Sequence, residues 1–270
     1  MVFKMKTSML FVVIAALTLT TTITAQEKTE ISQSIGQQIN EQAVKINGVK
    51  DPDWKSYKTM VKGLDVFEQF RALAPQALPK FQLIPRKAEI TMEGVNLRLV
   101  VNEIAQPIPL AQDGTFTLPR DGTALQSNAE LVINSQKSLY RWWPYVRSPQ
   151  VKMNQRRLGD VRMECEMFWA IYYDDIPFVI RNGIRAIGGP CHTAKIKMYF
   201  PSDFIGLKEA RLIQHGRQFI LPLSKDKLQF YIPIFDPLYQ DDAMIELEYD
   251  NTTEPLKRNY SGIMVGTSLL

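Results

Sequence analysis

The sequence has very little of what metal sites are usually built from. Its 270 residues include only two histidines and two cysteines. His192 and His215 do not stand in a His-x-x-x-His or Glu-x-x-His spacing, whereas a catalytic zinc typically has three protein ligands and a water. His192 directly follows Cys191, and a cysteine held in a disulfide is not a thiolate ligand. We therefore expect no metal and no cofactor.

Three signature motifs of large enzyme classes are also absent. There is no Gly-x-Ser-x-Gly nucleophile elbow and no Gly-x-x-x-x-Gly-Lys phosphate loop. Gly183, Gly188 and Gly189 do not form the dinucleotide-binding pattern. Because catalytic triads are defined by their geometry in three dimensions, a hydrolase whose site is assembled only in the fold stays open as an alternative.

Long apolar runs are missing as well. The run Met9–Leu17 follows Lys4 and Lys6, and it leads through a Thr-rich stretch to Ala25, a small residue before Gln26. This order is typical of a secretory signal peptide cleaved after residue 25. The run is well short of the roughly 20 residues that span a bilayer, so a retained anchor is the weaker alternative. We expect a periplasmic or secreted protein with no transmembrane segment in the mature chain.

Net charge is small, which bears on the partners. The formal charge is +4 and falls to +2 when residues 1–25 leave with their two lysines. So small a charge gives no attraction for nucleic acid or anionic membrane along the whole sequence. We expect a protein or glycan of the cell envelope as partner, and no nucleic acid.

The two cysteines, Cys165 and Cys191, predict a disulfide, because an even pair in an exported chain is usually oxidised. Closing this loop of about 27 residues stabilises the fold by roughly 3.5 kcal/mol in the chain-entropy model. A redox-active pair is the alternative, but the Cys-x-x-Cys spacing is missing.

A helix is predicted over residues 51–75. Asp51 is a candidate N-cap, Pro52 suits the first helical position, and Pro75 ends the pattern. Apolar residues at spacings of three and four share one face: Trp54, Tyr57, Val61, Leu64 and Phe67. We expect this stripe to pack against the rest of the protein, with partner binding as the minor alternative.

From Lys80 the pattern becomes strand-like. Strands are predicted at 81–84, 88–92, 96–101, 108–110, 115–119 and 129–134, with a turn at Asp113-Gly114. The same order returns about 113 residues later. The correspondences are Arg98-Leu99-Val100 with Arg211-Leu212-Ile213, Ile108-Pro109-Leu110 with Leu221-Pro222-Leu223, Asp113 with Asp226, Phe116 with Phe230, Pro119 with Pro233, and 128–131 with 242–245. One residue is inserted in the second turn.

This ordered series predicts a mainly β fold of two duplicated β-sandwich modules (Ig-like or transthyretin-like) with one N-terminal helix. The chain divides into a signal peptide (1–25), a polar leader (26–50), the helix (51–75), a first module (80–150), a disulfide-tied connector (151–194), a second module (195–250) and a tail (251–270).

The connector has its own expected elements. Tyr140–Tyr145 is aromatic and extended, and Leu158–Trp169 alternates as a strand would. That alternation would place Val161, Met163, Cys165 and Met167 on one face. A helix is expected from about Asp174 to Ala186, ended by Gly188-Gly189-Pro190.

Two resemblances follow from these residues. The Pro-Leu strand, the Asp-Gly turn and the Phe-x-Leu-Pro strand resemble carboxypeptidase-regulatory-like (transthyretin-like) domains over about 60 residues, which implies a β-sandwich. The run from Arg156 to Cys165 is similar to an uncharacterised family of exported proteobacterial proteins, which implies no activity and no site residues.

The candidate binding residues are the aromatic and basic cluster Arg141, Trp142, Trp143, Tyr145 and Arg147. Flat rings beside guanidinium groups suit stacking on sugars or docking of a protein strand. Packing of the tryptophans between the modules is the alternative, because neighbouring residues point to opposite faces of a strand. Of the paired acids, Asp174-Asp175 could start a helix and Asp241-Asp242 suits a turn, and neither catalysis nor calcium binding is predicted from their spacing.

We therefore expect a non-catalytic binding or assembly protein of the cell envelope that presents sheet edges or an aromatic patch. An envelope hydrolase and a purely structural module are the alternatives. A cleft that gathers a histidine or carboxylates with shifted pKa values would favour the enzyme, and an exposed apolar patch would favour binding.

Overall fold

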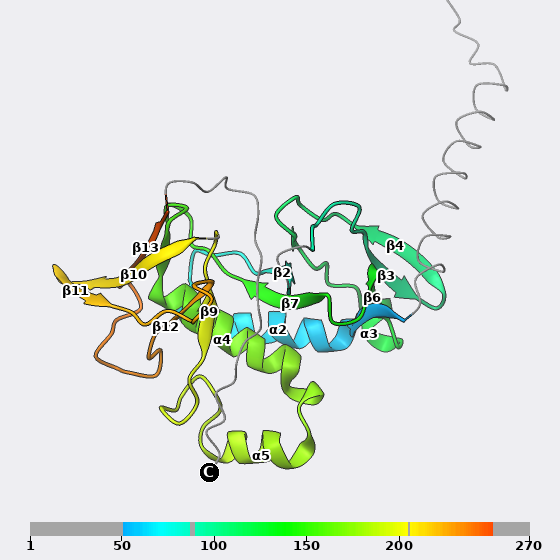
Figure 1. The fold of residues 1–270 in the computed structure, drawn as a ribbon. Helices are drawn as coiled ribbons and strands as arrows, with labels where there is room; N and C mark the ends of the chain where they lie inside the picture. The colour runs from blue at the N-terminus through cyan, green and yellow to red at the C-terminus, as the bar shows by residue number, and fades with distance from the viewer. Residues whose placement is uncertain (1–50, 87–89, 205, 251–270) are drawn as a thin grey trace, which may run out of the picture. The chain divides into compact units, whose positions relative to one another are not determined.

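A computed structural model describes residues 51–86, 90–204 and 206–250 (Figure 1). The expected signal peptide, polar leader and tail lie outside these residues. The first half contains β1 (Pro52–Ser56), α2 (Tyr57–Gln69), η1 (Arg71–Leu73), β2 (Lys80–Pro85), β3 (Leu97–Val101), β4 (Ile104–Ile108), β5 (Thr115–Phe116), α3 (Gly122–Gln126), β6 (Glu130–Gln136) and β7 (Tyr140–Tyr145). The second half contains β8 (Gln155–Arg157), α4 (Leu158–Tyr172), η2 (Tyr173–Asp175), α5 (Phe178–Ala186), β9 (Tyr199–Pro201), β10 (Leu207–Gln214), β11 (Arg217–Ile220), β12 (Gln229–Tyr231) and β13 (Met244–Tyr249).

The fold is mixed α/β, with more strand than helix and several antiparallel sheets. It does not form two clear sandwiches, and the helices are not confined to one at the N-terminal side, so those two parts of the expected architecture are wrong. None of the helices in the described ranges is long and apolar enough to cross a membrane.

The strand order is the same in the two halves. The sheet of the first half runs β1-β6-β3-β4, and the sheet of the second half, read from its other end, runs β8-β13-β10-β11. The β2–β5 pair of the first half matches the β9–β12 pair of the second. The matching order therefore begins with β1 and β8, upstream of the strands that the sequence comparison used.

The pairing registers agree residue by residue. Leu99 of β3 lies opposite Leu131 of β6, and at the corresponding positions Leu212 of β10 lies opposite Ile245 of β13. The β2–β5 and β9–β12 pairs also agree: Phe81 lies opposite Phe116, and Phe200 lies opposite Phe230. Each of these two phenylalanine pairs is also in ring contact, with interplanar angles of 32° and 34°.

The turns correspond too. Asp113 accepts a hydrogen bond from the backbone N–H two residues ahead, at 2.9 Å, and Asp226 does so at 3.1 Å. Such Asx turns fold the chain back locally, so the turn aspartates have the same role in both halves.

Two cores lie on either side of the β2–β7 pair. Successive residues of a strand point to opposite faces, so Leu83 and Trp142 enter the core of the first half, while Ile84 and Trp143 enter the core of the second. Helix α4 also serves both cores, because Met163 packs in the first and Cys165 in the second. The halves are therefore interlocked.

The expected helix over 51–75 is shorter. Residues Pro52–Ser56 form β1, which pairs with β6, and Ser56 caps α2 by accepting a hydrogen bond from the Thr59 N–H. Trp54 lies in β1 and is exposed, whereas the rest of the predicted stripe is buried. Sheet pairing of the residues before Tyr57 has overridden the Asp-Pro start signal.

The segment Leu158–Trp169, expected as a strand, is part of the helix α4. The alternating residues Val161, Met163, Cys165 and Met167 are all buried, but so are Asp160, directly before them, and Glu164, between Met163 and Cys165. A helix that is covered by packing has no exposed side, so its sequence need not show polar residues at a period of 3.6. The strand prediction for this segment is therefore wrong. The segment Ile90–Met92 is also not a strand.

Other expectations agree with the structure. Tyr140–Tyr145 is the extended strand β7, and α5 ends at Ala186. Gly188 and Gly189 follow with φ of 96° and 84°, and their N–H groups bond back to Arg185 and Ile184. Glycine adopts this left-handed backbone without strain, which is why the helix ends there.

Candidate functional site

The predicted aromatic and basic cluster lies on β7 and in the residues that follow it. Trp142 and Trp143 are 2% and 1% exposed. The Trp142 ring meets Phe116 edge-on at 6.1 Å, and the Trp143 ring lies 4.8 Å from Phe168. Both tryptophans fill cores, which is the packing alternative. Arg141 is buried beside them.

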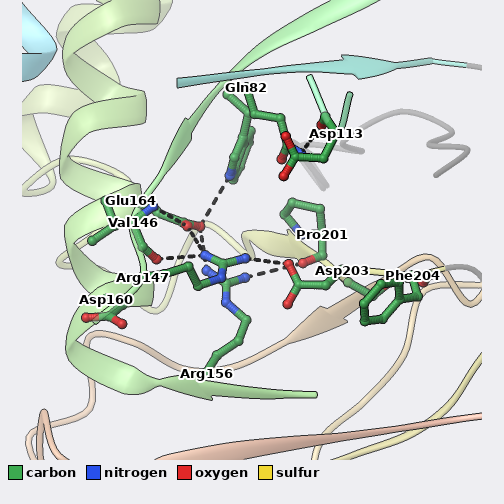
Figure 2. Close-up of polar contacts among 12 residues, drawn as sticks. Gln82, Asp113, Val146, Arg147, Arg156, Asp160, Glu164, Pro201, Asp203 and Phe204 are labelled. Carbon is green, nitrogen blue, oxygen red and sulfur yellow. Dashed lines mark hydrogen bonds and ion pairs between the residues drawn. The ribbon is translucent and has the colours of Figure 1, made fainter. Parts of the chain in front are cut away.

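Arg147, the last member of the cluster, links three segments (Figure 2). Its Nη1 lies 2.5 Å from Glu164 Oε1 of α4, and its Nη2 lies 2.6 Å from Asp203 Oδ1 after β9. Its guanidinium also lies 4.4 Å from the centre of the Tyr145 ring. Desolvation opposes the charge, but Asp203 and Glu164 hold the pKa of Arg147 well above the ordinary arginine value. The group stays charged and exchanges no proton.

Glu164 is the centre of this buried network. Besides Arg147, it accepts hydrogen bonds from Arg156 Nη2 at 2.6 Å, the Val146 N–H at 3.0 Å and Trp143 Nε1 at 3.3 Å. Buried charges persist where ion pairs and hydrogen bonds compensate their desolvation, as here. The arrangement ties β7, β8 and α4 together, and we assign it a structural role.

A buried basic residue recurs at the matching place of the first half. Lys55 lies opposite Leu131 in the sheet, as Arg156 lies opposite Ile245. The Lys55 ammonium pairs with Asp175 and donates to the Ile171 carbonyl at 3.2 Å. Each half therefore directs one basic side chain from its first strand towards an acid on α4 or η2.

The predicted disulfide between Cys165 and Cys191 is confirmed. It joins α4 to the loop that follows α5. The chain has no other cysteine, so no free thiol is present.

Beside this bridge, His192 makes a close polar contact with a carboxylate that the sequence did not predict. Its Nε2 lies 2.7 Å from Glu166 Oε1. Glu166 belongs to α4 and is mostly buried, and desolvation raises its pKa while His192 opposes that rise. A histidine beside a carboxylate is an arrangement that enzymes use for general acid–base catalysis.

The pair lies between two hollows of the surface. One, of about 510 Å³, has Trp169, Tyr173 and Lys62 on its walls. The other, of about 390 Å³, has Arg162, Phe235 and Asp241. The described residues that line them include no serine, threonine or free thiol, so those residues offer no such nucleophile for acyl transfer.

Three of the four paired acids, Asp174, Asp175 and Asp241, are engaged in ion pairs. Asp174 lies 2.7 Å from Lys62, Asp175 pairs with Lys55, and Asp241 lies 2.5 Å from Arg162. Lys62 lowers the pKa of Asp174 by its hydrogen bond. No group of three potential ligands among histidine, cysteine, aspartate and glutamate is found in the parts of the chain that the structure describes.

Two edge strands occupy equivalent places, β4 in the first sheet and β11 in the second. Each follows a two-residue turn with positive φ, Asn102-Glu103 and His215-Gly216. Such turns fix the register, so alternate residues bond to the neighbouring strand and the others point their backbone groups outward. By this rule the outward residues are Ala105 and Pro107 in β4, and Gln218 and Ile220 in β11.

The two edges differ at one of these outward positions. Pro107 lies opposite Arg98, and its counterpart Ile220 lies opposite Arg211. Proline has no N–H and blunts an edge, whereas isoleucine leaves its N–H free to bond another strand. All four residues of β11 are exposed, and Ile220 is 74% exposed.

This asymmetry was within reach of the sequence, because the spacing of 113 residues aligns Pro107 with Ile220. The His192–Glu166 pair was not, because only the fold brings the two residues together. No family model, curated protein or solved structure matches this chain, so the argument about its function depends on these residues alone.

Proposed function

We propose that this protein is a non-catalytic binding protein of the cell envelope, which takes up an extended segment of a partner protein along β11. The observation that carries the proposal is the outer edge of β11, along which no other strand of the described residues pairs. The outward N–H and C=O groups of Gln218 and Ile220 repeat two residues apart, which is about 6.8 Å along a strand and matches the pairing groups of an added strand.

Side-chain chemistry supports a protein partner over a glycan. Ile220 is apolar and highly exposed, and Phe219 is partly exposed against Tyr239, with ring centres 5.8 Å apart. An added strand would cover both residues, one on each face of the sheet. Trp142 and Trp143, the two tryptophans of the predicted cluster, lie inside the cores.

Export is part of the proposal. The tripartite start of the sequence indicates a signal peptide, and the disulfide fits an oxidising compartment. We also infer that the two halves arose by duplication of one module, from their common strand order and registers. An experimental structure in which the β3–β4 and β10–β11 registers disagree would remove that support.

The substitution Ile220→Pro tests the docking edge, because it copies Pro107 into the second sheet. The outward N–H is lost and no bond to β10 is broken, so the fold should be retained. Ile220→Val is the matched control, since it keeps the N–H. In pull-downs from envelope extract we expect the same partner with wild type and Ile220→Val, and a loss of at least about tenfold with Ile220→Pro.

Hydrogen exchange supplies the physical readout. The amides of Gln218 and Ile220 should exchange rapidly in the free protein and become protected in the complex. Equal recovery of the partner by Ile220→Pro, or protection elsewhere only, would show that β11 is not the docking edge.

An envelope hydrolase is the second candidate, and it is favoured by the His192–Glu166 pair, which lies at the two surface hollows described above. His192 would take a proton from an attacking water, with Glu166 orienting the ring. His192→Asn should then abolish hydrolysis of any ester, amide or glycoside substrate that the wild type cleaves. Equal turnover by both proteins would exclude this role.

A further inference from the structure

Helix α5 differs from the other long helices because it buries none of its residues. Its first residues are strongly exposed, Phe178 at 68% and Val179 at 80%. By contrast, α2 and α4 bury most of their apolar residues in the cores. In Figure 1 α5 lies at the bottom of the view, beyond α4. Its apolar side chains are not used in the cores.

The residues of α5 are nevertheless sorted by polarity. At 100° per residue, one side carries Val179, Ile180, Gly183, Ile184, Ala186 and, after the helix, Ile187. The opposite side carries Arg181, Asn182 and Arg185, together with Phe178, whose ring centre lies 5.5 Å from the Arg181 guanidinium. A helix with one apolar and one basic side, both accessible, is typical of segments that lie in a membrane interface.

The local charge is of one sign. Between Asp175 and Asp203 the chain has four basic residues and no acidic one. Arg185 on the polar side is exposed, and Arg181 lies 3.2 Å from Asp174, which also pairs with Lys62. The small net charge of the whole chain therefore hides a basic segment.

The helix is attached to the body at both ends and buries none of its residues fully. Before it, Asp174 and Asp175 of η2 pair with Lys62 of α2 and Lys55 of β1. After it, the disulfide at Cys191 fixes the loop to α4. A helix tethered in this way presents its apolar side at a defined place, which reduces the entropy cost of docking.

We infer that α5 docks on an anionic phospholipid surface, with Val179 and Ile180 in the acyl boundary and the arginines at the phosphates. Charge complementarity selects this occupant, because basic side chains gain from an anionic leaflet and an apolar side gains from the acyl region. The site is separate from β11 and does not depend on the function proposed for that strand.

Vesicle co-sedimentation of the full mature chain tests the inference. Vesicles of phosphatidylcholine alone are compared with vesicles that contain about 30 mol % phosphatidylglycerol. We expect about thirtyfold tighter binding to the anionic vesicles, as for two arginines near such a surface, and weaker binding at high salt. Equal affinity for the two compositions, or no binding to either, would overturn the inference.

Two pairs of variants locate the contact. Val179→Glu places a charge on the apolar side and should abolish binding, whereas Ile104→Glu on β4, at a side chain 66% exposed, should not. Arg185→Gln should weaken anionic binding about fivefold, whereas Lys152→Gln, at another exposed position, should leave it unchanged.

Soluble polyglutamate separates a lipid surface from an acidic protein. If it binds as tightly as the anionic vesicles and Val179→Glu has no effect, charge alone governs the contact and the membrane assignment is wrong. If the Val179→Glu variant binds the vesicles as tightly as the wild type does, α5 is not the part of the protein that contacts the membrane.

Discussion

At the scale of single residues, the main feature is a set of buried charged side chains that are paired with one another. Glu164 and Arg156 are almost wholly buried, and each would be costly to leave alone. The network is complete around Glu164, which has four partners in the backbone and side chains of neighbouring segments. Removing Glu164 should therefore lower the stability of the protein.

Glu164→Gln should lower the free energy of unfolding by about 3 kcal/mol, because Arg156 and Arg147 would keep their charges without the carboxylate. Urea denaturation measures the change. Glu68→Gln is the control, because the Glu68–Arg71 pair is exposed and its loss should leave the midpoint unchanged. A similar response of both variants would contradict a buried network.

Asp53 should make stability fall as pH rises. Desolvation raises the pKa of Asp53 above its ordinary value of 3.8, although Trp142 hydrogen-bonds to it. The native state therefore binds the proton more tightly than the unfolded chain, and this contribution is lost as pH rises above about 4. Relative to wild type, Asp53→Asn should become more stable in urea titrations as pH rises above about 4.

Asp174→Asn gives the opposite sign. Lys62 lowers the pKa of Asp174, so its charged form stabilises the native state and the contribution is lost as pH falls. The free energy of unfolding of this variant, relative to wild type, should therefore decrease as pH rises. Parallel pH profiles for the two variants would refute the assignment.

At the scale of elements, the space around two helical glycines shows that α2 is closely packed and that α5 is not. A Cβ on Gly63 would lie 2.7 Å from Ile171 Cγ2, where α2 meets α4, whereas a Cβ on Gly183 of α5 meets nothing within 4 Å. Glycine at the first place is required by the close approach of the helices. At the second it only weakens the helix.

Gly63→Ala should destabilise the protein by about 1–3 kcal/mol, because the buried contact with Ile171 must give way. Gly183→Ala should stabilise α5 locally by up to about 1 kcal/mol. Thermal unfolding reports the first change, and hydrogen exchange of the α5 amides reports the second. Slower exchange in both variants would contradict the packing described for Gly63.

At the scale of the whole molecule, the halves share a topology but not independent cores. Met163, Met167 and Ile171 come from the second half and fill the first core, while Ile84 and Trp143 come from the first half and fill the second. Each half lacks part of its own interior.

Fragments 51–150 and 151–250 should therefore not fold separately, and should regain structure when mixed. Near-ultraviolet circular dichroism follows this, since Trp142 and Trp143 are ordered only in the cores. A cooperative unfolding transition of either fragment alone would show that the halves are independent domains.

The sequence by itself determined the features that depend on neighbouring residues. The Asp113 and Asp226 turns, the glycine end of α5 and the β3 and β10 strands could be predicted because their signals are local. The Cys165–Cys191 bridge followed from the cysteine count.

Only the tertiary structure decided the rest. Helix α4 showed strand-like alternation because burial on all sides removes the period that solvent imposes. The His192–Glu166 pair and the matching of Lys55 with Arg156 also needed the fold, since their partners are chosen by strand order and helix packing. Contacts between distant residues are set by how cores fill, and a linear pattern does not record that.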